Sequence, residues 1–319
     1  MKKISIFCTL GPSSLNKKFL KYSRKKISLL RLNMSHIETK NLTKQILFIR
    51  SHTKTPICLD TEGAQIRTKI KKKFFYKKKN VIKIKKNKGN INFYPDDVFS
   101  KLLKGDILDI GFNDLRVSII TKDNKKLKLK VITPGLFENN KGVCILNRKI
   151  NLNFLTDKDL DAIKIGKRLN IKNYALSFTN SKKDIKNFKK ILQKKNKIFK
   201  IETKKAIRNL KEIISEGNNF LIDRGDLSKE FNVELIPILQ RKILKMANSK
   251  KNKKVFIATN FLESMLTSKT PNRGESNDIY SSLEMGASGL VLAAETAIGK
   301  YPSEAINFLN KMIKLYKKN

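Results

Sequence analysis

A lysine and a glutamate lie two positions apart in the segment FKIETKK, residues 199–205. Side chains alternate along a β-strand, so Lys200 and Glu202 point to the same side and can face one ligand together. An ammonium group neutralises phosphate charge, and a carboxylate is a hard oxygen ligand that suits Mg2+. The pair therefore indicates an anion site beside a metal site.

Eight short apolar runs predict the strands that would position such side chains. They occupy residues 4–10, 27–32, 56–60, 174–178, 197–201, 220–224, 255–259 and 289–293. Helical periodicity between and after these runs predicts three helices. One begins after a Ser181 N-cap, one spans residues 203–217 and ends at Gly217, and the last begins with Pro302. Alternating strands and helices predict a parallel α/β fold, and eight units predict a closed (β/α)8 TIM barrel.

One stretch breaks this rhythm. From about residue 69 to residue 149 the sequence alternates between apolar and polar residues, as in KLKLKVI, with turn signals at NKGN, YPDD and KDNKK. We expect a small all-β domain inserted after the third strand, at 69–149, and a barrel formed by 1–68 and 150–319. Domains inserted at this end of a barrel commonly act as lids.

The C-terminal ends of barrel strands are where catalytic groups lie in parallel barrels. This rule selects a set of polar residues that follow the eight predicted strands: Thr9, Gly11, Ser13, Arg31, Asn33, Ser35, Asp60, Thr61, Arg67, Ser177, Lys200, Glu202, Arg224, Gly225, Asp226, Thr259, Glu295 and Thr296. Glu202 and Asp226 suit Mg2+. Arg31, Arg67 and Lys200 can hold phosphate. Oxygen-bearing side chains suit a second, monovalent cation: Asn33, Ser35, Asp60 and Thr61.

The charge balance is strongly basic, with 70 Lys+Arg against 27 Asp+Glu and a formal net charge of +43. Such an excess attracts nucleic acid, membrane surfaces or anionic metabolites. However, lysine is spread over nearly every segment, together with many Asn, Ile and Phe and no Trp, which is typical of a compositional bias in the coding DNA. The charge alone therefore assigns no partner.

The numbers and spacing of cysteine and histidine indicate the cellular location and exclude some kinds of metal site. The three cysteines show no C-x-x-C spacing, which favours reduced thiols and a cytoplasmic location, and Cys8 and Cys58 are expected to be buried. Two histidines exclude histidine-rich metal sites. The N-terminal apolar stretch has no small-residue cleavage site after it, so we expect no export signal, and no run is long enough to span a bilayer.

Seven motifs occur along the chain in one order: CTLGPSS, RLNMSH, LDTEGAQIRT, FKIET, DRGDL, IATNFLESM and AAETAIGKYPSEA. In this order and spacing they resemble the pyruvate kinase family, from about residue 3 to the C-terminus and interrupted only in the insertion. The resemblance implies a barrel with a β-domain lid. It also implies phosphoryl transfer from phosphoenolpyruvate to ADP, giving pyruvate and ATP.

The resemblance also implies roles for individual residues. Lys200 would stabilise the migrating phosphoryl group and the enolate, Arg31 would contact phosphate, and Thr259 would lie near the carbon that is protonated. The remaining implied contacts are Mg2+ or Mn2+ at Glu202 and Asp226, K+ at Asn33, Ser35, Asp60 and Thr61, substrate at Gly225, Asp226 and Arg67, and nucleotide at Pro12 and His36.

Several positions depart from the family pattern. Gln65 stands where K+-dependent members typically carry Glu, and Ala64 replaces Pro, so K+ dependence is left open. In the insertion IGFNDL lacks the paired aspartates and keeps Asp114, and CILN replaces Leu-Pro-Gly. Ser228, Asn277 and Ala293-Ala294 also differ. The chain ends where the family usually continues into a C-terminal allosteric domain, so we expect a form without that domain.

Two other functions stay open at this stage. One is a related Mg2+-dependent barrel enzyme that acts on phosphoenolpyruvate or pyruvate without nucleotide. The other is a degenerate basic protein that binds polyanions, although no interleaved aromatic and basic motif of RNA-binding modules is present. We expect no membrane partner and no specific nucleic acid, and we leave a homo-oligomer open.

Overall fold

The structure, a computed structural model, describes residues 3–86, 89–111 and 114–318. Two positions of the IGFNDL motif, 112 and 113, therefore lie outside the described residues. The chain divides into two compact units, 1–63 with 157–319, and 64–156. Each unit is described by itself below.

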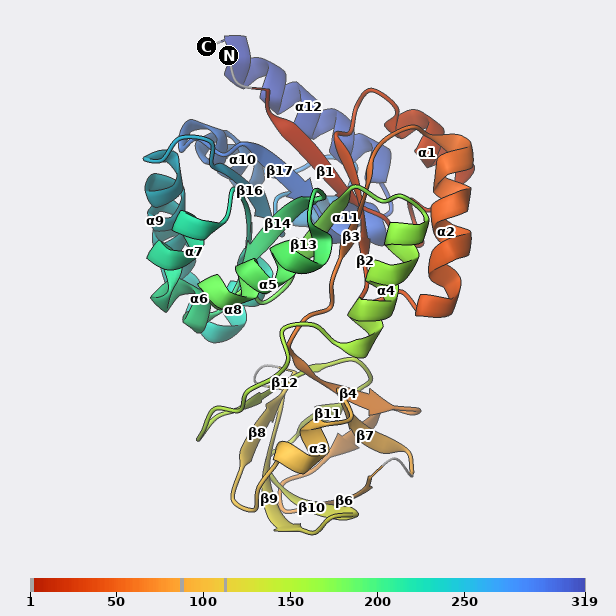
Figure 1. The fold of residues 1–319 in the computed structure, drawn as a ribbon, viewed down its shortest axis with the longest axis vertical. Coiled ribbons are helices and arrows are strands. Elements are labelled where there is room, and N and C mark those ends of the chain that lie inside the picture. The colour runs from red at the N-terminus through yellow and green to blue at the C-terminus, as the bar shows by residue number, and fades with distance from the viewer. Residues whose placement is uncertain (1–2, 87–88, 112–113, 319) are drawn as a thin grey trace. The chain divides into compact units, whose positions relative to one another are not determined.

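The first unit is a closed barrel of eight parallel strands in the order β1-β17-β16-β15-β14-β13-β3-β2 (Figure 1). This confirms the predicted fold class. Neighbouring strands pair in parallel register, for example Asn33 opposite Asp60 and Ile201 opposite Ile222. The strands are β1 (Ser5–Thr9), β2 (Leu29–Asn33), β3 (Ile57–Asp60), β13 (Asn173–Leu176), β14 (Asn196–Ile201), β15 (Asn219–Asp223), β16 (Lys254–Ala258) and β17 (Gly289–Leu292).

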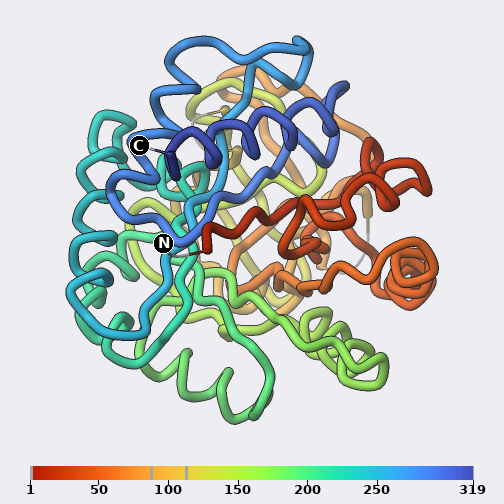
Figure 2. Tube along the Cα trace, turned by 90° about the horizontal axis from the view of Figure 1, so that it is seen from above, coloured from red at the N-terminus to blue at the C-terminus, as the bar shows by residue number. Residues whose placement is uncertain are grey.

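Helices surround the barrel, and the view from above shows them at the periphery of this unit (Figure 2). They are α1 (Lys17–Ser23), α2 (Thr39–His52), α4 (Asp157–Arg168), α5 (Lys182–Leu192), α6 (Lys204–Arg208), α7 (Leu210–Glu216), α8 (Arg224–Glu230), α9 (Ile236–Asn248), α10 (Arg273–Glu284), α11 (Ala294–Ala297) and α12 (Pro302–Lys318), with 3-10 turns η1 (Val233–Leu235) and η2 (Glu263–Leu266). The predicted Ser181 cap is confirmed, since its hydroxyl accepts a hydrogen bond from the Asp184 N–H. Within the described part of the chain, no helix is both long and apolar enough to cross a bilayer.

The apolar spacing over residues 203–217 predicts the buried side chains correctly, but the helix that it predicts is interrupted. It predicts one helix, whereas the structure has α6 and α7 with a break at Asn209, whose φ is −96° and ψ 15°. The Asn209 side-chain amide donates to the carbonyl of Asn180 at 2.7 Å, which holds the residue in this conformation. The predicted end at Gly217 is confirmed as the C-cap of α7.

The barrel interior is a packed apolar core. Inward-facing residues from the strands form it: Phe7, Leu29, Cys58, Ala175, Ile198, Leu221, Phe256, Ala258 and Val291. The rings of Phe7 and Phe256 lie 4.4 Å apart. As predicted, Cys8 and Cys58 are buried. Because this core fills the barrel, polar chemistry is confined to the strand ends.

The second unit is an antiparallel β structure with its own apolar core. Its larger sheet has the order β6-β10-β9-β8-β12-β4-β7, and β11 pairs with β5. The elements are β4 (Ile66–Ile70), β5 (Phe74–Tyr76), β6 (Val81–Lys85), β7 (Ile91–Tyr94), α3 (Val98–Lys101), β8 (Ile107–Ile110), β9 (Leu115–Lys122), β10 (Lys126–Thr133), β11 (Gly135–Phe137) and β12 (Gly142–Ile145). Strand β4, which begins before the expected start of the insertion at residue 69, belongs to this sheet.

Candidate active site

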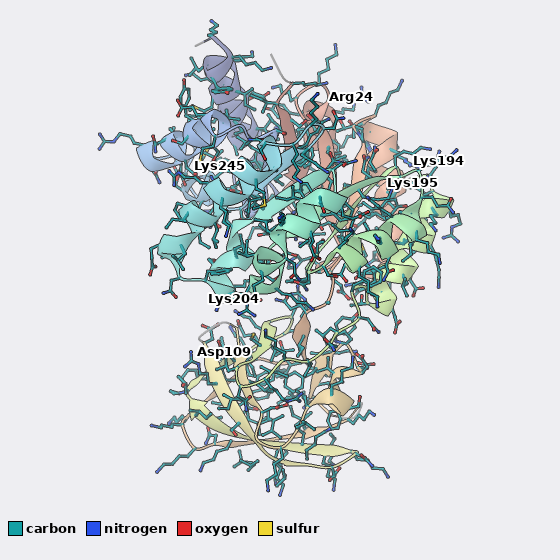
Figure 3. The ribbon with its side chains drawn as sticks, turned by 60° about the vertical axis from the view of Figure 1, so that its left-hand side comes forward. Arg24, Asp109, Lys194, Lys195, Lys204 and Lys245 are labelled. Atoms are coloured by element: carbon teal, nitrogen blue, oxygen red, sulfur yellow. The ribbon has the colours of Figure 1, made fainter. Side chains whose placement is uncertain are left out.

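Lys200 differs from the other lysines by its burial. Exposed lysines such as Lys194, Lys204 and Lys245 lie on the turn after α5, on α6 and on α9 (Figure 3). Lys200 lies near the end of β14, and only 5% of it is exposed. A charged side chain is rarely buried to this degree unless it is paired. Its position therefore requires specific partners.

The Lys200 ammonium contacts oxygens from four residues. Its Nζ lies 3.0 Å from Glu202 Oε2, 3.2 Å from Asp223 Oδ2 and 3.8 Å from Asp60 Oδ2, and it donates to Ser177 Oγ at 3.2 Å. These groups come from the ends of β14, β15 and β3 and from the residue after β13. The predicted neighbourhood of Lys200 and Glu202 is thus present as a direct ion pair.

Electrostatics fix Lys200 as a cation. Burial alone would lower its pKa, but the nearby charges of Asp60, Glu202 and Asp223 outweigh burial and raise the pKa of Lys200. A second buried cation lies beside it. Arg31 places Nη1 3.3 Å from Asp60 Oδ2 and donates from Nε to Thr9 Oγ1 at 3.0 Å. Asp60 therefore links the two cations.

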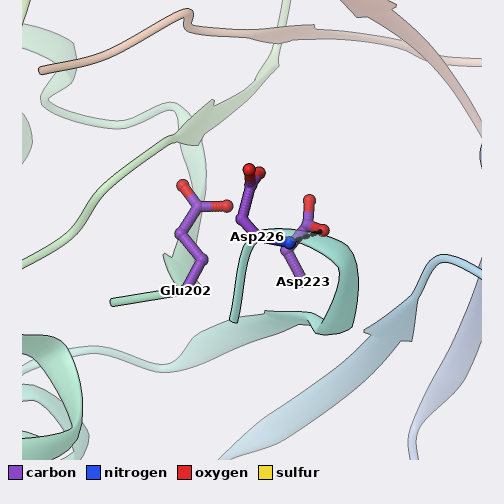
Figure 4. A group of neighbouring side chains, drawn as sticks. All are labelled: Glu202, Asp223 and Asp226. Atoms are coloured by element: carbon purple, nitrogen blue, oxygen red, sulfur yellow. Dashed lines mark hydrogen bonds between the residues drawn. The ribbon is translucent and has the colours of Figure 1, made fainter. Parts of the chain in front are cut away.

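Three carboxylates gather at the ends of β14 and β15. Glu202, Asp223 and Asp226 each offer an oxygen, and these oxygens lie within 4.8 Å of one another (Figure 4). Glu202 Oε1 accepts a hydrogen bond from the Phe178 N–H at 2.5 Å. Its buried Oε2 accepts no hydrogen bond within the described part of the chain. Asp226 is partly exposed and pairs with Lys229 at 2.6 Å.

This donor set fits a divalent cation. Hard carboxylate oxygens are the ligands that Mg2+ and Mn2+ prefer. Burial, together with the charges of Asp226 and Asp223, raises the pKa of Glu202 despite the presence of Lys200. A divalent cation between these carboxylates would offset the repulsion among their charges. Glu202 and Asp226 are the two ligands that the sequence predicts, and the buried Oε2 of Glu202 faces the Lys200 ammonium at 3.0 Å, where a metal would share it.

Asp223 is the residue that sequence reasoning missed. Burial would raise its pKa, but Lys200 and Arg31 outweigh burial and lower it, so the carboxylate is ionised. Asp223 falls inside the predicted strand 220–224 and not after its end. The available signal was a carboxylate at the end of an apolar run, since Asp223 is the last residue of β15 and the N-cap of α8. The rule of strand ends applies to it as well as to Asp226.

Thr259 and Gly225 touch each other beside this cluster. The Gly225 N–H donates to Thr259 Oγ1 at 2.8 Å, and the Thr259 hydroxyl donates to the Ala258 carbonyl. Thr259 has a φ of +74°, which is strained for a β-branched residue. The Arg224 guanidinium donates to the Thr259 carbonyl and pairs with Asp278 at 2.7 Å, which supports this conformation.

The four predicted ligands of a monovalent cation lie at the adjacent ends of β2 and β3. Asn33 is opposite Asp60 in the barrel register. Asn33 Oδ1 accepts from the Ser35 N–H at 3.0 Å, and Thr61 Oγ1 accepts from the Ser177 N–H at 2.9 Å. Their oxygens therefore belong to one polar edge that also includes Asp60.

The remaining predicted residues lie on loops or in the other unit. Pro12 is exposed on the loop after β1, and His36 is exposed on the loop after β2, where its N–H donates to the Asn33 carbonyl at 3.1 Å. Arg67 belongs to β4 of the second unit, where Nη1 donates to the Asn140 carbonyl at 3.4 Å. Gln65 is also in that unit. Within the barrel unit, the structure thus brings together Arg31, Asp60, Lys200, Glu202 and Asp226.

Comparison with known proteins agrees with this geometry. The family described as "Pyruvate kinase, barrel domain" matches residues 1–306. A pyruvate kinase of Thermotoga maritima is 32% identical over 98% of this chain and 71% of its own length. Plastidial pyruvate kinase 3 of Arabidopsis thaliana is 31% identical, and a pyruvate kinase of Staphylococcus epidermidis is 30% identical. The chain spans 57% and 56% of those two proteins. The chain belongs to the pyruvate kinase family.

Proposed function

We propose that this chain transfers the phosphoryl group of phosphoenolpyruvate to ADP and forms pyruvate and ATP. The bond between phosphorus and the enol oxygen breaks, a bond forms from phosphorus to a terminal oxygen of ADP, and the enolate then takes a proton at its methylene carbon. The observation that carries the proposal is the buried Lys200 ammonium beside Glu202 and the second buried cation, Arg31.

Lys200 and Arg31 would act on the phosphoryl group. Both are held by buried carboxylates, so their charges are fixed before substrate arrives. Preorganised cations stabilise charge that develops in a transition state far better than mobile ones. Lys200 would face both the migrating phosphoryl group and the enolate oxygen, and Arg31 would contact the phosphate.

Glu202 and Asp226 would hold Mg2+ or Mn2+. When bound, the cation would neutralise charge on substrate oxygens and orient them. The Thr259 hydroxyl, fixed by Gly225 and Ala258, would lie near the carbon that receives the proton. The peptide at Gly225 would receive the substrate carboxylate. We also propose that Asn33, Ser35, Asp60 and Thr61 hold K+.

The nucleotide would contact Pro12 and His36. These residues follow β1 and β2, which are neighbours in the barrel, so their loops emerge side by side. Arg67 is proposed as a substrate contact from residue type and motif alone. The proposed setting is cytoplasmic, in glycolysis.

The test is pyruvate formation by the purified chain from phosphoenolpyruvate and ADP with Mg2+, in K+ or in Na+ buffer. We expect pyruvate only when ADP and the divalent cation are both present. Consumption of phosphoenolpyruvate without ADP would support the barrel enzyme that needs no nucleotide. Absence of turnover together with salt-sensitive RNA binding would support the polyanion-binding protein.

A further inference from the structure

Asp223 occupies a junction between the two halves of the site. It is 5% exposed, it ends β15, and it precedes α8, which carries Asp226. No role is assigned to it by the reaction proposed above. Its carboxylate nevertheless lies between the residue that would act on phosphate and a residue that would hold the metal.

Each oxygen of Asp223 has its own partner. Oδ2 lies 3.2 Å from Lys200 Nζ, and Oδ1 accepts a hydrogen bond from the Asp226 N–H at 3.4 Å (Figure 4). The carboxylate therefore ties the Lys200 ammonium to the backbone of Asp226. One oxygen thus faces Lys200 and the other caps α8, so Asp223 can hold both in place.

The other two carboxylates around Lys200 each have a second partner besides the ammonium. Glu202 Oε2 is the oxygen closest to Lys200, but it is also the buried oxygen that would bind a metal. Asp60 is farther away, at 3.8 Å, and is shared with Arg31. Once Glu202 binds a cation, Asp223 is the only carboxylate within 3.5 Å that stays directed at Lys200 among the ion pairs of the described residues.

We propose that Asp223 is a positioning residue that holds the Lys200 ammonium in place while Glu202 and Asp226 bind the divalent cation. Without it, the ammonium would stay on Glu202 Oε2, which it already contacts at 3.0 Å, and compete with the metal for that oxygen. Loss of Asp223 is therefore expected to weaken metal binding and to misplace Lys200 during phosphoryl transfer. The kinetic part of this inference rests on the proposed function.

Two substitutions of Asp223 distinguish its ion pair with Lys200 from its role as the N-cap of α8. Asp223→Asn keeps an oxygen that can accept from the Asp226 N–H but removes the charge facing Lys200, whereas Asp223→Ala removes both contacts. The control is Glu216→Gln, which removes a carboxylate paired with Lys189 at the end of α7, the helix that precedes β15. All variants are made in the full chain, and their folding is checked by circular dichroism.

The first readout is Mn2+ affinity of the substrate-free protein, measured by electron paramagnetic resonance of free Mn2+. The second is kcat and KM for phosphoenolpyruvate at saturating metal. We expect Asp223→Asn to weaken Mn2+ binding about tenfold or more and to lower kcat by about 10- to 100-fold, with KM changed far less. Asp223→Ala should resemble it, and Glu216→Gln should match the wild type.

The outcomes distinguish this inference from the proposed function. A kcat of Asp223→Asn within twofold of the wild type, with only Asp223→Ala impaired, would reduce Asp223 to a helix cap and overturn the inference. A wild-type chain without kinase activity would contradict the proposed function alone. In that case the Mn2+ measurement decides, and an affinity unchanged in Asp223→Asn overturns the inference.

Discussion

Lys200 is distinguished from its many exposed counterparts by burial and by the carboxylates that surround it. We expect Lys200→Met to lower kcat by about 10²–10³-fold or more, because a fixed charge at the reacting phosphoryl group is lost. Lys204→Met, at an exposed site, should leave kcat unchanged. Steady-state kinetics at saturating substrates measure both.

Lys200→Arg provides a conservative comparison. Arginine keeps the charge but replaces a compact ammonium with a planar guanidinium, so it should restore stability and little of the activity. Lys200→Met should also unfold at lower temperature, since it leaves buried carboxylates without their cation. Wild-type activity in either variant would show that Lys200 does not contact the reacting group.

The two buried thiols make a separate prediction. Burial raises the pKa of Cys8 to about 12 and raises that of Cys58 as well. In the native protein at pH 8, a disulfide reagent should therefore label Cys144, which is partly exposed, and spare the other two. All three should react in guanidinium chloride. Rapid labelling of Cys144→Ser in the native state would contradict this account.

For single residues, the sequence predicts contacts within one strand better than contacts between strands. Spacing along one strand placed Lys200 beside Glu202, because the alternation of side chains is local. The contact between Lys200 and Asp223 joins two strands, and a single sequence contains no rule that pairs them. Asp223 was therefore recognisable only as a carboxylate at a strand end.

Among the elements, the second unit is stabilised by an ion pair between buried Asp106, the residue before β8, and partly exposed Arg148, in the segment after β12. Arg148 donates to Asp106 at 2.5 and 2.7 Å, and Asp106 is 2% exposed. Burial would raise the pKa of Asp106, but Arg148 and the Leu103 N–H outweigh burial and lower it. A carboxyl whose pKa is lower in the folded state stabilises the fold above its unfolded pKa of about 3.9.

We expect Asp106→Asn to lower the free energy of unfolding by about 1–3 kcal/mol at neutral pH. The difference from the wild type should shrink as pH falls below about 4, because the wild-type carboxyl becomes protonated through its lowered folded pKa. Thermal melts of both proteins between pH 2.5 and pH 7 measure this difference in stability. Asp97→Asn, which removes an exposed pair with Lys101, should change little. A difference independent of pH would contradict the assignment.

Apolar periodicity predicts which side chains of an element are buried, but not where a helix breaks or which strands pair. Apolar spacing identified the buried face across residues 203–217, because burial depends on the side chains of that segment. The break between α6 and α7 depends instead on a hydrogen bond from Asn209 to Asn180, which lies in a different loop. Similarly, β4 follows the barrel strand directly but pairs with β7 and β12, which come later in the chain.

For the whole molecule, the formal charge of +43 predicts self-repulsion in the folded state. Raising NaCl from about 0.02 to 0.5 M shortens the Debye length to a few ångströms and should raise the Tm by several degrees. Scanning calorimetry at fixed pH and fixed protein concentration checks this. A Tm that is unchanged or falls with salt would indicate that the distributed lysines do not limit stability.

The central claim is that the barrel site moves a phosphoryl group from phosphoenolpyruvate to ADP. Phosphorus-31 NMR of the purified chain with phosphoenolpyruvate, ADP and Mg2+ tests it most directly, because it identifies the acceptor. The account predicts that the phosphoenolpyruvate signal declines while the γ-phosphate signal of ATP grows, and that neither changes with Lys200→Met. A persistent phosphoenolpyruvate signal, or the appearance of inorganic phosphate without ADP, would contradict it.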